Sequence, residues 1–368
     1  MACTTYELGL NWPHGRAEGF VAEIERAARR RRIRWICVGR EQAERVRRRI
    51  DRRTMKIGLF LNTQADGVNM QRPDMLLCRS LKAAGSFVVE DPDDAAVYAD
   101  RALQISYLER AGLAVPPYVV VPPQQHEHAP VPRAQRAKLG ANWVARPAVG
   151  MGSTRHLLSR ARHIAPALKK AGFAPGIKLL VQKAYPTVQH GARPARVRMW
   201  HLFGWVVPAW AAEDPLQPRR IGADEWARWE LSDLAVITRR IATITGLDWF
   251  VSEFLFVGSG NRRKALVTEP ANALAGLGPG LNPHGGMPAD VARIAADRIA
   301  ETAWRLARQL DLDTGVNLRL AAATANEAGR ETASYPSRRM RPRTNTSPQT
   351  MSASRSRTAR RPARAAIR

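Results

Sequence analysis

Two glutamates and an asparagine lie on a pair of strand-like segments joined by a short turn. The β-prone runs 249–257 and 264–269 flank a turn-rich stretch, residues 258–263. A hairpin symmetric about residue 261 places Glu253 directly opposite Glu269, and facing like charges are destabilising unless a cation compensates them. Asn272 adds a neutral oxygen three residues later, and such an all-oxygen set suits Mg²⁺. The alternative is that Glu253 points to solvent or pairs with one of the basic residues Arg262, Arg263 and Lys264.

A second group of residues has the chemistry to bind phosphate. Gly150 and Gly152 lack side chains, so their backbone N–H groups can approach an anion, and Ser153 adds a hydroxyl. Arg101 and Arg146 would add permanent positive charge near the phosphates. The alternative for the glycine-rich stretch is a plain flexible turn.

Two further arginines, Arg196 and Arg198, lie two residues apart on a predicted strand, so they share one face of it. Both are candidates to point into a site, with Arg198 favoured, and solvent-facing side chains are the alternative. His201 and His284 are candidate substrate contacts, but isolated histidines are more often structural.

Taken in chain order, five segments resemble the motifs of ATP-grasp enzymes, over about residues 98–289. Residues 100–116 resemble the helix and loop that open that domain, and 144–153 resemble its nucleotide-binding strand and glycine-rich lid. Residues 180–185 resemble the strand whose backbone meets adenine, and 196–208 resemble the strands that follow. The pair Ser252 and Glu253, with Glu269 and Asn272 on the next strand, resembles the metal-binding hairpin.

The resemblance implies a site for ATP and for Mg²⁺ or Mn²⁺. It assigns the metal to Glu253, Glu269 and Asn272, and the catalytic arginines to Arg198 and Arg196. ATP would be bound by Arg101, Arg146, Gly150, Gly152, Ser153, Gln182, Lys183, Ala184 and Tyr185. The family usually has Lys where this chain has Arg101 and Arg146. This difference would affect the geometry with which ATP binds and the rate of the reaction.

Within the superfamily the chain is most similar to ligases of the RimK and D-alanine ligase type. Such enzymes activate a carboxylate as an acyl phosphate for attack by an amine, so the implied partners are small-molecule or peptide carboxylates and amines. Metal and arginine charge with correct orientation would suffice for this reaction, without a protein nucleophile. The alternatives are an ATP-grasp kinase or phosphotransferase, a catalytically weakened nucleotide-binding protein, and a nucleic-acid binder.

The elements that must position these residues predict an α/β fold. Helices over 18–32 and 41–53 alternate with strands over 33–38 and 55–61, and a helix over 74–84 precedes a strand over 87–89. This alternation predicts a Rossmann-like pre-ATP-grasp region over residues 1–97. Residues 98–324 form the predicted ATP-grasp domain, with helices over 100–111, 231–245 and 289–310, a strand over 118–121 and an antiparallel sheet over 142–268.

The formal net charge of +26 is unevenly distributed over the 368 residues. Residues 329–368 hold eleven arginines and one acid, Glu331, with few large aliphatic residues, so we predict a disordered Arg-rich tail over 325–368 that binds polyanions weakly. The arginine runs at 29–32 and 45–53 are interpreted as solvated helix ends, with an anionic partner as the alternative. The chain lacks a long apolar run, a signal-like start and paired cysteines, which favours a cytoplasmic protein that does not contact membranes.

Overall fold

The N-terminal part of the chain folds into a parallel four-stranded sheet. The computed structural model describes residues 3–11, 18–63, 71–93, 100–122, 133–149, 156–159, 177–186, 189–190, 193–194, 196–211, 219–258, 263–272 and 287–312. The strand order is β2-β1-β3-β4, with β1 Thr4–Asn11, β2 Trp35–Val38, β3 Met55–Leu61 and β4 Phe87–Val89. Parallel pairing requires crossover connections, in which lie the helices α1 Glu18–Arg31, α2 Arg40–Asp51 and α3 Pro73–Ala83.

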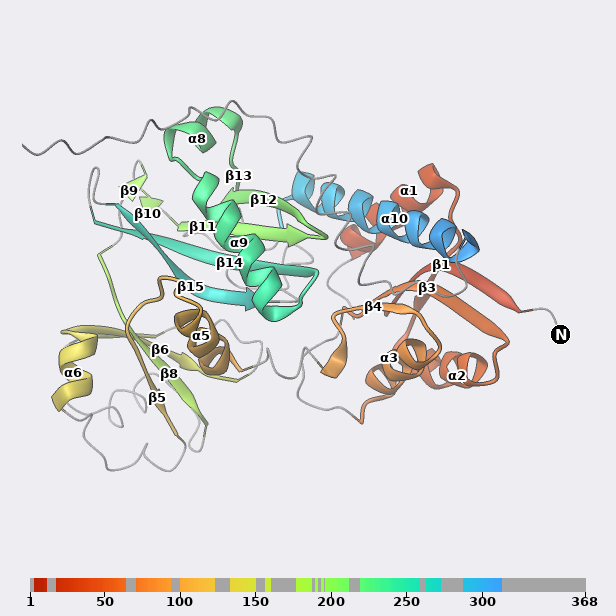
Figure 1. Cartoon of the computed structure of the whole chain (residues 1–368), viewed down its shortest axis with the longest axis horizontal. Helices are drawn as coiled ribbons and strands as arrows, with labels where there is room; N and C mark the ends of the chain where they lie inside the picture. The colour runs from red at the N-terminus through yellow and green to blue at the C-terminus, as the bar shows by residue number, and fades with distance from the viewer. Residues whose placement is uncertain are drawn as a thin grey trace, which may run out of the picture.

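Helices cover both faces of this sheet (Figure 1). On one face α1 packs beside α10 Ala289–Leu312, and residues such as Ile24 and Ile299 bury the strand residues Leu59 and Leu61. On the other face α2 and α3 bury Phe60. The core on the α1 side of the sheet therefore contains residues of both β1 and α10, the first strand and the last helix among the described residues.

A second, antiparallel sheet of four strands lies at the other end of the molecule (Figure 1). Its order is β5-β8-β6-β7, with β5 Tyr118–Val121, β6 Asn142–Pro147, β7 His156–Ser159 and β8 Leu179–Lys183. Helix α6 Arg133–Leu139 contributes Leu139 to the core on one face, which also contains Trp143. Helix α5 Arg101–Arg110 packs Ile105 against Leu180 in a separate cluster.

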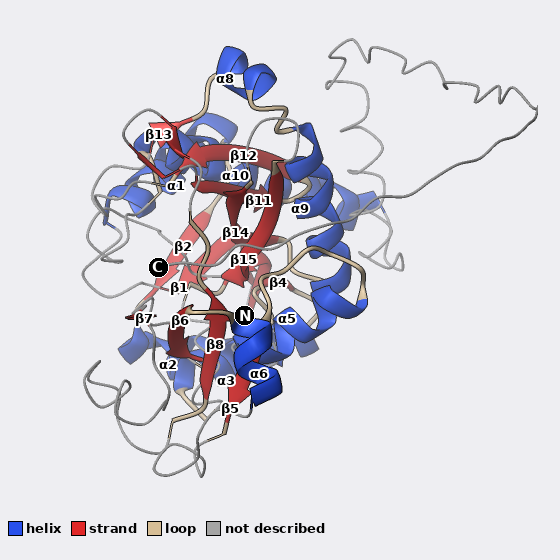
Figure 2. Cartoon of the chain, turned by 90° about the vertical axis from the view of Figure 1, so that its left-hand side faces the viewer, coloured by secondary structure: helices blue, strands red, loops and turns tan. Residues whose placement is uncertain are grey.

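The third sheet is antiparallel and has the order β13-β12-β11-β14-β15 (Figure 2). Its bounds are β11 Arg196–Leu202, β12 Trp205–Trp210, β13 Arg219–Arg220, β14 Trp249–Val257 and β15 Lys264–Asn272. The short strands β9 Gln189–His190 and β10 Arg193–Pro194 pair with each other, and α8 Ala223–Arg228 follows β13. Helix α9 Ser232–Thr245 packs Ile241 against one face of the third sheet, whereas α10 lies against the other.

The predicted α/β fold class with its antiparallel part is confirmed. The predicted strands 55–61, 87–89 and 118–121 have the bounds of β3, β4 and β5. The predicted helices over 74–84, 100–111 and 231–245 are each followed by a glycine with a positive φ angle, 87° at Gly85, 75° at Gly112 and 69° at Gly246. The strand β1 was not predicted. Both predicted domain boundaries and the Arg-rich tail lie outside the described residues.

No helix within the described ranges is long and apolar enough to span a membrane.

Candidate active site

The hairpin of β14 and β15 places Glu253 opposite Glu269, as the sequence predicted. The pairing near the turn, such as Val257 with Lys264, would put Thr268 opposite Glu253 if it continued unbroken. Glu269 would then face the opposite side of the sheet. An irregularity in the register at Thr268 supplies one extra residue on β15, and the Thr268 hydroxyl donates to the Glu253 carbonyl at 3.1 Å. This β-bulge brings both carboxylates to one face.

A second irregularity follows on β15, between Glu269 and Asn272, so that Asn272 pairs with Val251. Pro270 lies inside it and cannot donate a backbone hydrogen bond, which an edge strand such as β15 tolerates. The strand β15 therefore continues to Asn272, three residues beyond the predicted strand end at Glu269.

The face of the sheet that carries Glu253 changes character along its strands. At one end Trp200 and Trp249 pack against the core that α10 closes, and Trp249 meets the Phe20 ring edge-on at 5.4 Å. Two residues further along β11, Arg198 lies directly opposite Glu253 on β14. This face of the sheet is therefore apolar and covered by α10 at one end, and charged at the other end, where a polar ligand could bind.

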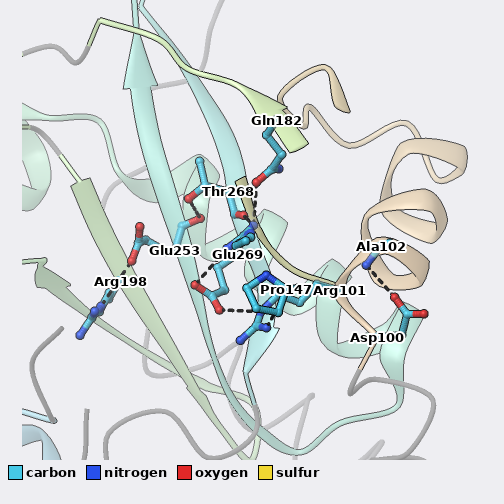
Figure 3. A network of polar contacts seen from close by, with 10 residues as sticks. Asp100, Arg101, Ala102, Pro147, Gln182, Arg198, Glu253, Thr268 and Glu269 are labelled. Atoms are coloured by element: carbon cyan, nitrogen blue, oxygen red, sulfur yellow. Dashed lines mark hydrogen bonds and ion pairs between the residues drawn. The ribbon is translucent and has the colours of Figure 1, made fainter. Parts of the chain in front are cut away.

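Three arginines contact the two glutamates, and Figure 3 labels two of them, Arg101 and Arg198. The Arg198 Nε lies 3.6 Å from a carboxylate oxygen of Glu253. Arg101 Nε donates to Glu269 at 3.2 Å, and Arg146 Nη1 donates to the other oxygen of Glu269 at 3.4 Å. All five side chains are buried, so the charges interact in a medium of low dielectric.

These arginines come from different parts of the fold and are held by further contacts. Arg146 on β6 donates to the Gln182 side chain on β8 at 2.8 Å and also to the Thr268 carbonyl. It therefore links the four-stranded and five-stranded sheets. Among the described residues, the buried Nε2 of Gln182 has no hydrogen-bond partner, which leaves a donor for a ligand in the cluster.

The N-terminus of α5 positions Arg101. Asp100 accepts hydrogen bonds from the N–H groups of Ala102 at 2.9 Å and Leu103 at 3.2 Å, which caps the helix. The Asp100 carboxylate also contacts Lys178 at 2.5 Å, and Arg101 N donates to the Ala148 carbonyl at 2.7 Å. The start of the helix is thereby fixed to the end of β6.

The charges of this cluster suit both a metal and phosphate. Three guanidinium groups outnumber two carboxylates, so the five side chains carry excess positive charge that favours an anion. The two carboxylates on one face fit the oxygen ligands that Mg²⁺ or Mn²⁺ requires. No group of three or more His, Cys, Asp or Glu that could hold a metal ion occurs within the described ranges.

The backbone at the end of β8 has groups to which a flat polar ligand could form hydrogen bonds. Lys183 N donates to the Pro117 carbonyl at 2.8 Å, and Ala184 N donates to the Asn142 carbonyl at 2.8 Å. Proline has no N–H, so Pro117 cannot return a hydrogen bond to the Lys183 carbonyl. Within the described part of the chain, that carbonyl therefore receives no backbone donor from Pro117, and the Tyr185 ring lies 5.0 Å from the Lys183 ammonium.

The remaining predicted residues have different positions. Arg196 is half-buried, lies on the same face as Arg198 and pairs with Leu255. Gly150, Gly152 and Ser153 lie outside the described residues, as does His284, and for Asn272 the structure describes the strand alone.

His201 lies on the opposite face of the sheet from Arg198. Its ring stacks on Phe250 at 5.0 Å, and Nδ1 is 3.2 Å from the Asp248 carbonyl. Burial lowers the pKa of His201 to about 4, so the ring is neutral at pH 7. It is a structural residue of the α9 core, not a member of the charged cluster.

Sequence reasoning did not identify the contacts that position the site. The cap by Asp100 had a signal, because Asp precedes the first helical residue. Pro117 directly before β5 also indicates a carbonyl without a backbone partner on the neighbouring strand. The bulge at Thr268 and the contact of Lys178 with Asp100 have no comparable signal, because both depend on tertiary packing.

Comparison with known proteins identifies the fold. No protein-family model and no curated protein sequence matches the chain. Among solved structures, the RimK domain ATP-grasp protein of Sphaerobacter thermophilus aligns with a TM-score of 0.54 at 16% identity, over 80% of this chain and 98% of its own. D-alanine–D-alanine ligase from Bacillus anthracis, complexed with ATP, aligns with a TM-score of 0.55 at 11% identity, over 85% and 100%. D-cycloserine synthetase aligns with 0.51 at 16% identity, over 81% and 99%.

These proteins define the class of fold. The chain has the ATP-grasp fold, so the fold predicted from its sequence motifs is confirmed. At identities of 11% to 16% the likeness concerns the fold alone.

Proposed function

We propose that this protein is an ATP- and Mg²⁺-dependent ligase that activates a carboxylate as an acyl phosphate and joins it to an amine. The observation that carries the proposal is the buried cluster of Glu253 and Glu269 with Arg101, Arg146 and Arg198, where the two antiparallel sheets meet. Solved structures of similar fold include D-alanine–D-alanine ligase and D-cycloserine synthetase, and the first is a complex with ATP.

In this proposal the metal is held by Glu253, Glu269 and Asn272. When bound, Mg²⁺ or Mn²⁺ would neutralise charge on the phosphate oxygens. Arg101 and Arg146 would then turn from Glu269 to the phosphates, because the metal compensates the carboxylate in their place. The interaction of Glu269 with two guanidinium groups supports this exchange, since its charge is already balanced by cations.

The nucleotide base would lie at the end of β8. The Lys183 carbonyl would accept from the amino group of adenine, while Gln182, Ala184 and Tyr185 would line the pocket. Gly150, Gly152 and Ser153 would close over the phosphates. The Lys183 carbonyl, to which Pro117 donates no hydrogen bond, supports this placement, because an acceptor at a strand end can recognise an amino group.

Arg198 and Arg196 would bind the carboxylate substrate and the transferred phosphoryl group. Their common face with Glu253 supports this role. The chain's own contribution is to hold the acceptor carboxylate in line with the transferred phosphoryl group and the amine beside the carboxylate carbon, with positive charge where negative charge accumulates. The proposed substrates are small molecules or peptides, and the cytoplasm is the proposed location.

Release of ADP from ATP tests the proposal. The purified full chain is incubated with ATP, Mg²⁺ and pools of amino acids and short peptides, each pool with and without an added amine. A ligase gives ADP release that requires a carboxylate and increases with the amine. ADP release that depends on a hydroxyl compound and ignores the amine would identify a kinase, and nucleotide binding without release would identify a weakened relative.

A further inference from the structure

A second charged region lies at the amino edge of the N-terminal sheet, where α1 and α2 end. We propose that this edge binds the phosphate backbone of double-stranded nucleic acid, without base recognition. The proposal is independent of the ligase activity, because the edge lies on a different sheet from the glutamate cluster.

The strand pairing brings two basic loops together. Glu7 N donates to the Arg34 carbonyl at 3.0 Å, and Thr4 N donates to the Thr54 carbonyl at 3.0 Å. The loop that follows α1 and the loop that follows α2 therefore flank the first residues of β1. Neighbouring strands are about 4.8 Å apart, so the two loops lie about 10 Å apart across β1.

The charge of this region exceeds what its own acids can balance. Residues 18–56 contain 14 basic and six acidic residues. The acids closest to the edge are already paired, Glu7 with Arg34 and Asp51 with Arg47. Six exposed basic side chains of residues 18–56 have no ion pair with any described residue, and these are Arg32, Arg40, Arg45, Arg52, Arg53 and Lys56. Arg40 is the first residue of α2, at the far end of that helix, and we call the other five residues the basic edge.

Two of the five occupy a backbone conformation that disfavours them. Arg32 has φ of 55° and Arg53 has φ of 56°, the left-handed conformation in which α1 and α2 terminate. The hydrogen bonds Ile33 N to Ala28 O and Thr54 N to Arg49 O close both helix ends in the manner for which glycine is preferred. Arginine at two such positions is conformationally unfavourable, and binding of an anion by these side chains would offset that cost.

The composition of the surface selects the kind of partner. Large apolar side chains that are exposed in the described ranges are Tyr107, Val149, Trp205 and Val236, and none belongs to residues 18–56. Stacking of unpaired bases requires exposed aromatic rings, and a protein partner requires apolar anchors. Binding to a duplex backbone requires neither, because release of counterions supplies the free energy and guanidinium groups match phosphate.

The test measures binding of the full chain to a fluorescent 20-base-pair duplex across a series of salt concentrations. The variant Arg32→Gly/Arg53→Gly removes two charges at positions that glycine favours. Each lost phosphate contact reduces the slope of log K against log salt by about 0.9, so we expect the slope to fall by about 2. The melting temperature should stay the same or rise, because glycine adopts this conformation without strain.

A matched control variant is Arg29→Ala/Arg48→Ala, which removes two exposed arginines that pair with Glu25 and Glu44. Its slope should change by less than half as much. A second variant, Arg52→Gln/Lys56→Gln, leaves the left-handed positions intact and should again lower the slope by about 2.

Three results would overturn the proposal. An unchanged slope in both edge variants would assign any binding to another part of the chain, such as the Arg-rich segment 329–368. Competition by polyglutamate as strong as by duplex, at equal charge, would identify an acidic protein as the partner. A lower melting temperature of Arg32→Gly/Arg53→Gly together with an unchanged slope would show that the two arginines stabilise the C-terminal ends of α1 and α2 through the helix macrodipole and do not bind nucleic acid.

Discussion

Substitution of Glu269 by Gln separates the two roles proposed for this carboxylate, as an ion-pair partner and as a metal ligand. Glu269 is 8% exposed and contacts Arg101, which is 5% exposed, and Arg146, which is 2% exposed. Glutamine keeps the size and one acceptor oxygen but removes the negative charge. The two buried guanidinium groups then lose their shared counterion.

The expected loss of stability follows from these contacts. Removal of one partner of a buried ion pair costs about 3–5 kcal/mol. Arg146 keeps its hydrogen bonds to Gln182 and to the Thr268 carbonyl, so we expect the lower end of this range, about 3 kcal/mol. For a folded unit of this size that corresponds to a fall in melting temperature of about 6–12 °C.

The assay combines thermal unfolding with turnover. ATP without metal should restore part of the lost stability of Glu269→Gln, because triphosphate supplies negative charge to Arg101 and Arg146. Mg²⁺-dependent ATP turnover should fall by at least about 100-fold, since a metal ligand is lost. Glu41→Gln, on the exposed surface of α2, is the matched control and should change neither quantity.

Two results would refute this reasoning. Mg²⁺-dependent turnover at the original rate in Glu269→Gln would remove this residue from the metal site. An unchanged melting temperature would show that the contacts with Arg101 and Arg146 do not contribute to folding. Because the measurements are independent, each role of Glu269 can fail alone.

Three further predictions concern Arg146, His201 and the C-terminal segment. Arg146→Ala should weaken ATP binding by about 30-fold or more by calorimetry, because a buried charge-assisted contact is worth about 2–5 kcal/mol, whereas equal weakening in the exposed control Arg45→Ala would indicate diffuse electrostatics. The pKa of His201 is lowered from 6.5 to about 4 by burial, so its contribution to stability is present above pH 6.5 and lost as the pH falls toward 4. Between pH 7 and pH 4 the free energy of unfolding of His201→Phe should therefore fall by on the order of 3 kcal/mol less than that of the original chain, as measured by denaturant titration. An equal fall in both proteins would refute this prediction. Truncation after Ala328 should leave the melting temperature and ATP affinity unchanged while removing most retention on a cation-exchange column, and unfolding of the truncated chain would contradict this.

Local sequence patterns predicted those elements whose residues alone determine them. The strand Met55–Leu61 is a mostly apolar run, interrupted by Lys56, that follows a charged helix, so its composition was sufficient to predict it. The strand β1, Thr4–Asn11, was missed although TTYELGLN contains the alternation of apolar and polar residues that favours a strand. Its position in the sheet, with β2 and β3 on its two sides, results from pairing with segments further along the chain.

The candidate site was predicted in its residue types but not in its contacts. The pairing of Glu253 with Glu269 was correct, although a symmetric hairpin was an incomplete reason, because the bulge at Thr268 creates it. The contact of Arg101 with Glu269 joins residues 168 positions apart. Only the meeting of α5 with the five-stranded sheet produces that contact, and no local pattern in the sequence encodes it.

Capture of the acyl phosphate by hydroxylamine is the most direct test of the proposed ligase. The full chain is given ATP, Mg²⁺, hydroxylamine and the carboxylate pools, and ADP and hydroxamate are measured in the same samples. A ligase should form one hydroxamate for each ADP released, and Glu269→Gln should form neither. ADP without hydroxamate, or phosphate transferred to a hydroxyl group, would contradict carboxylate activation.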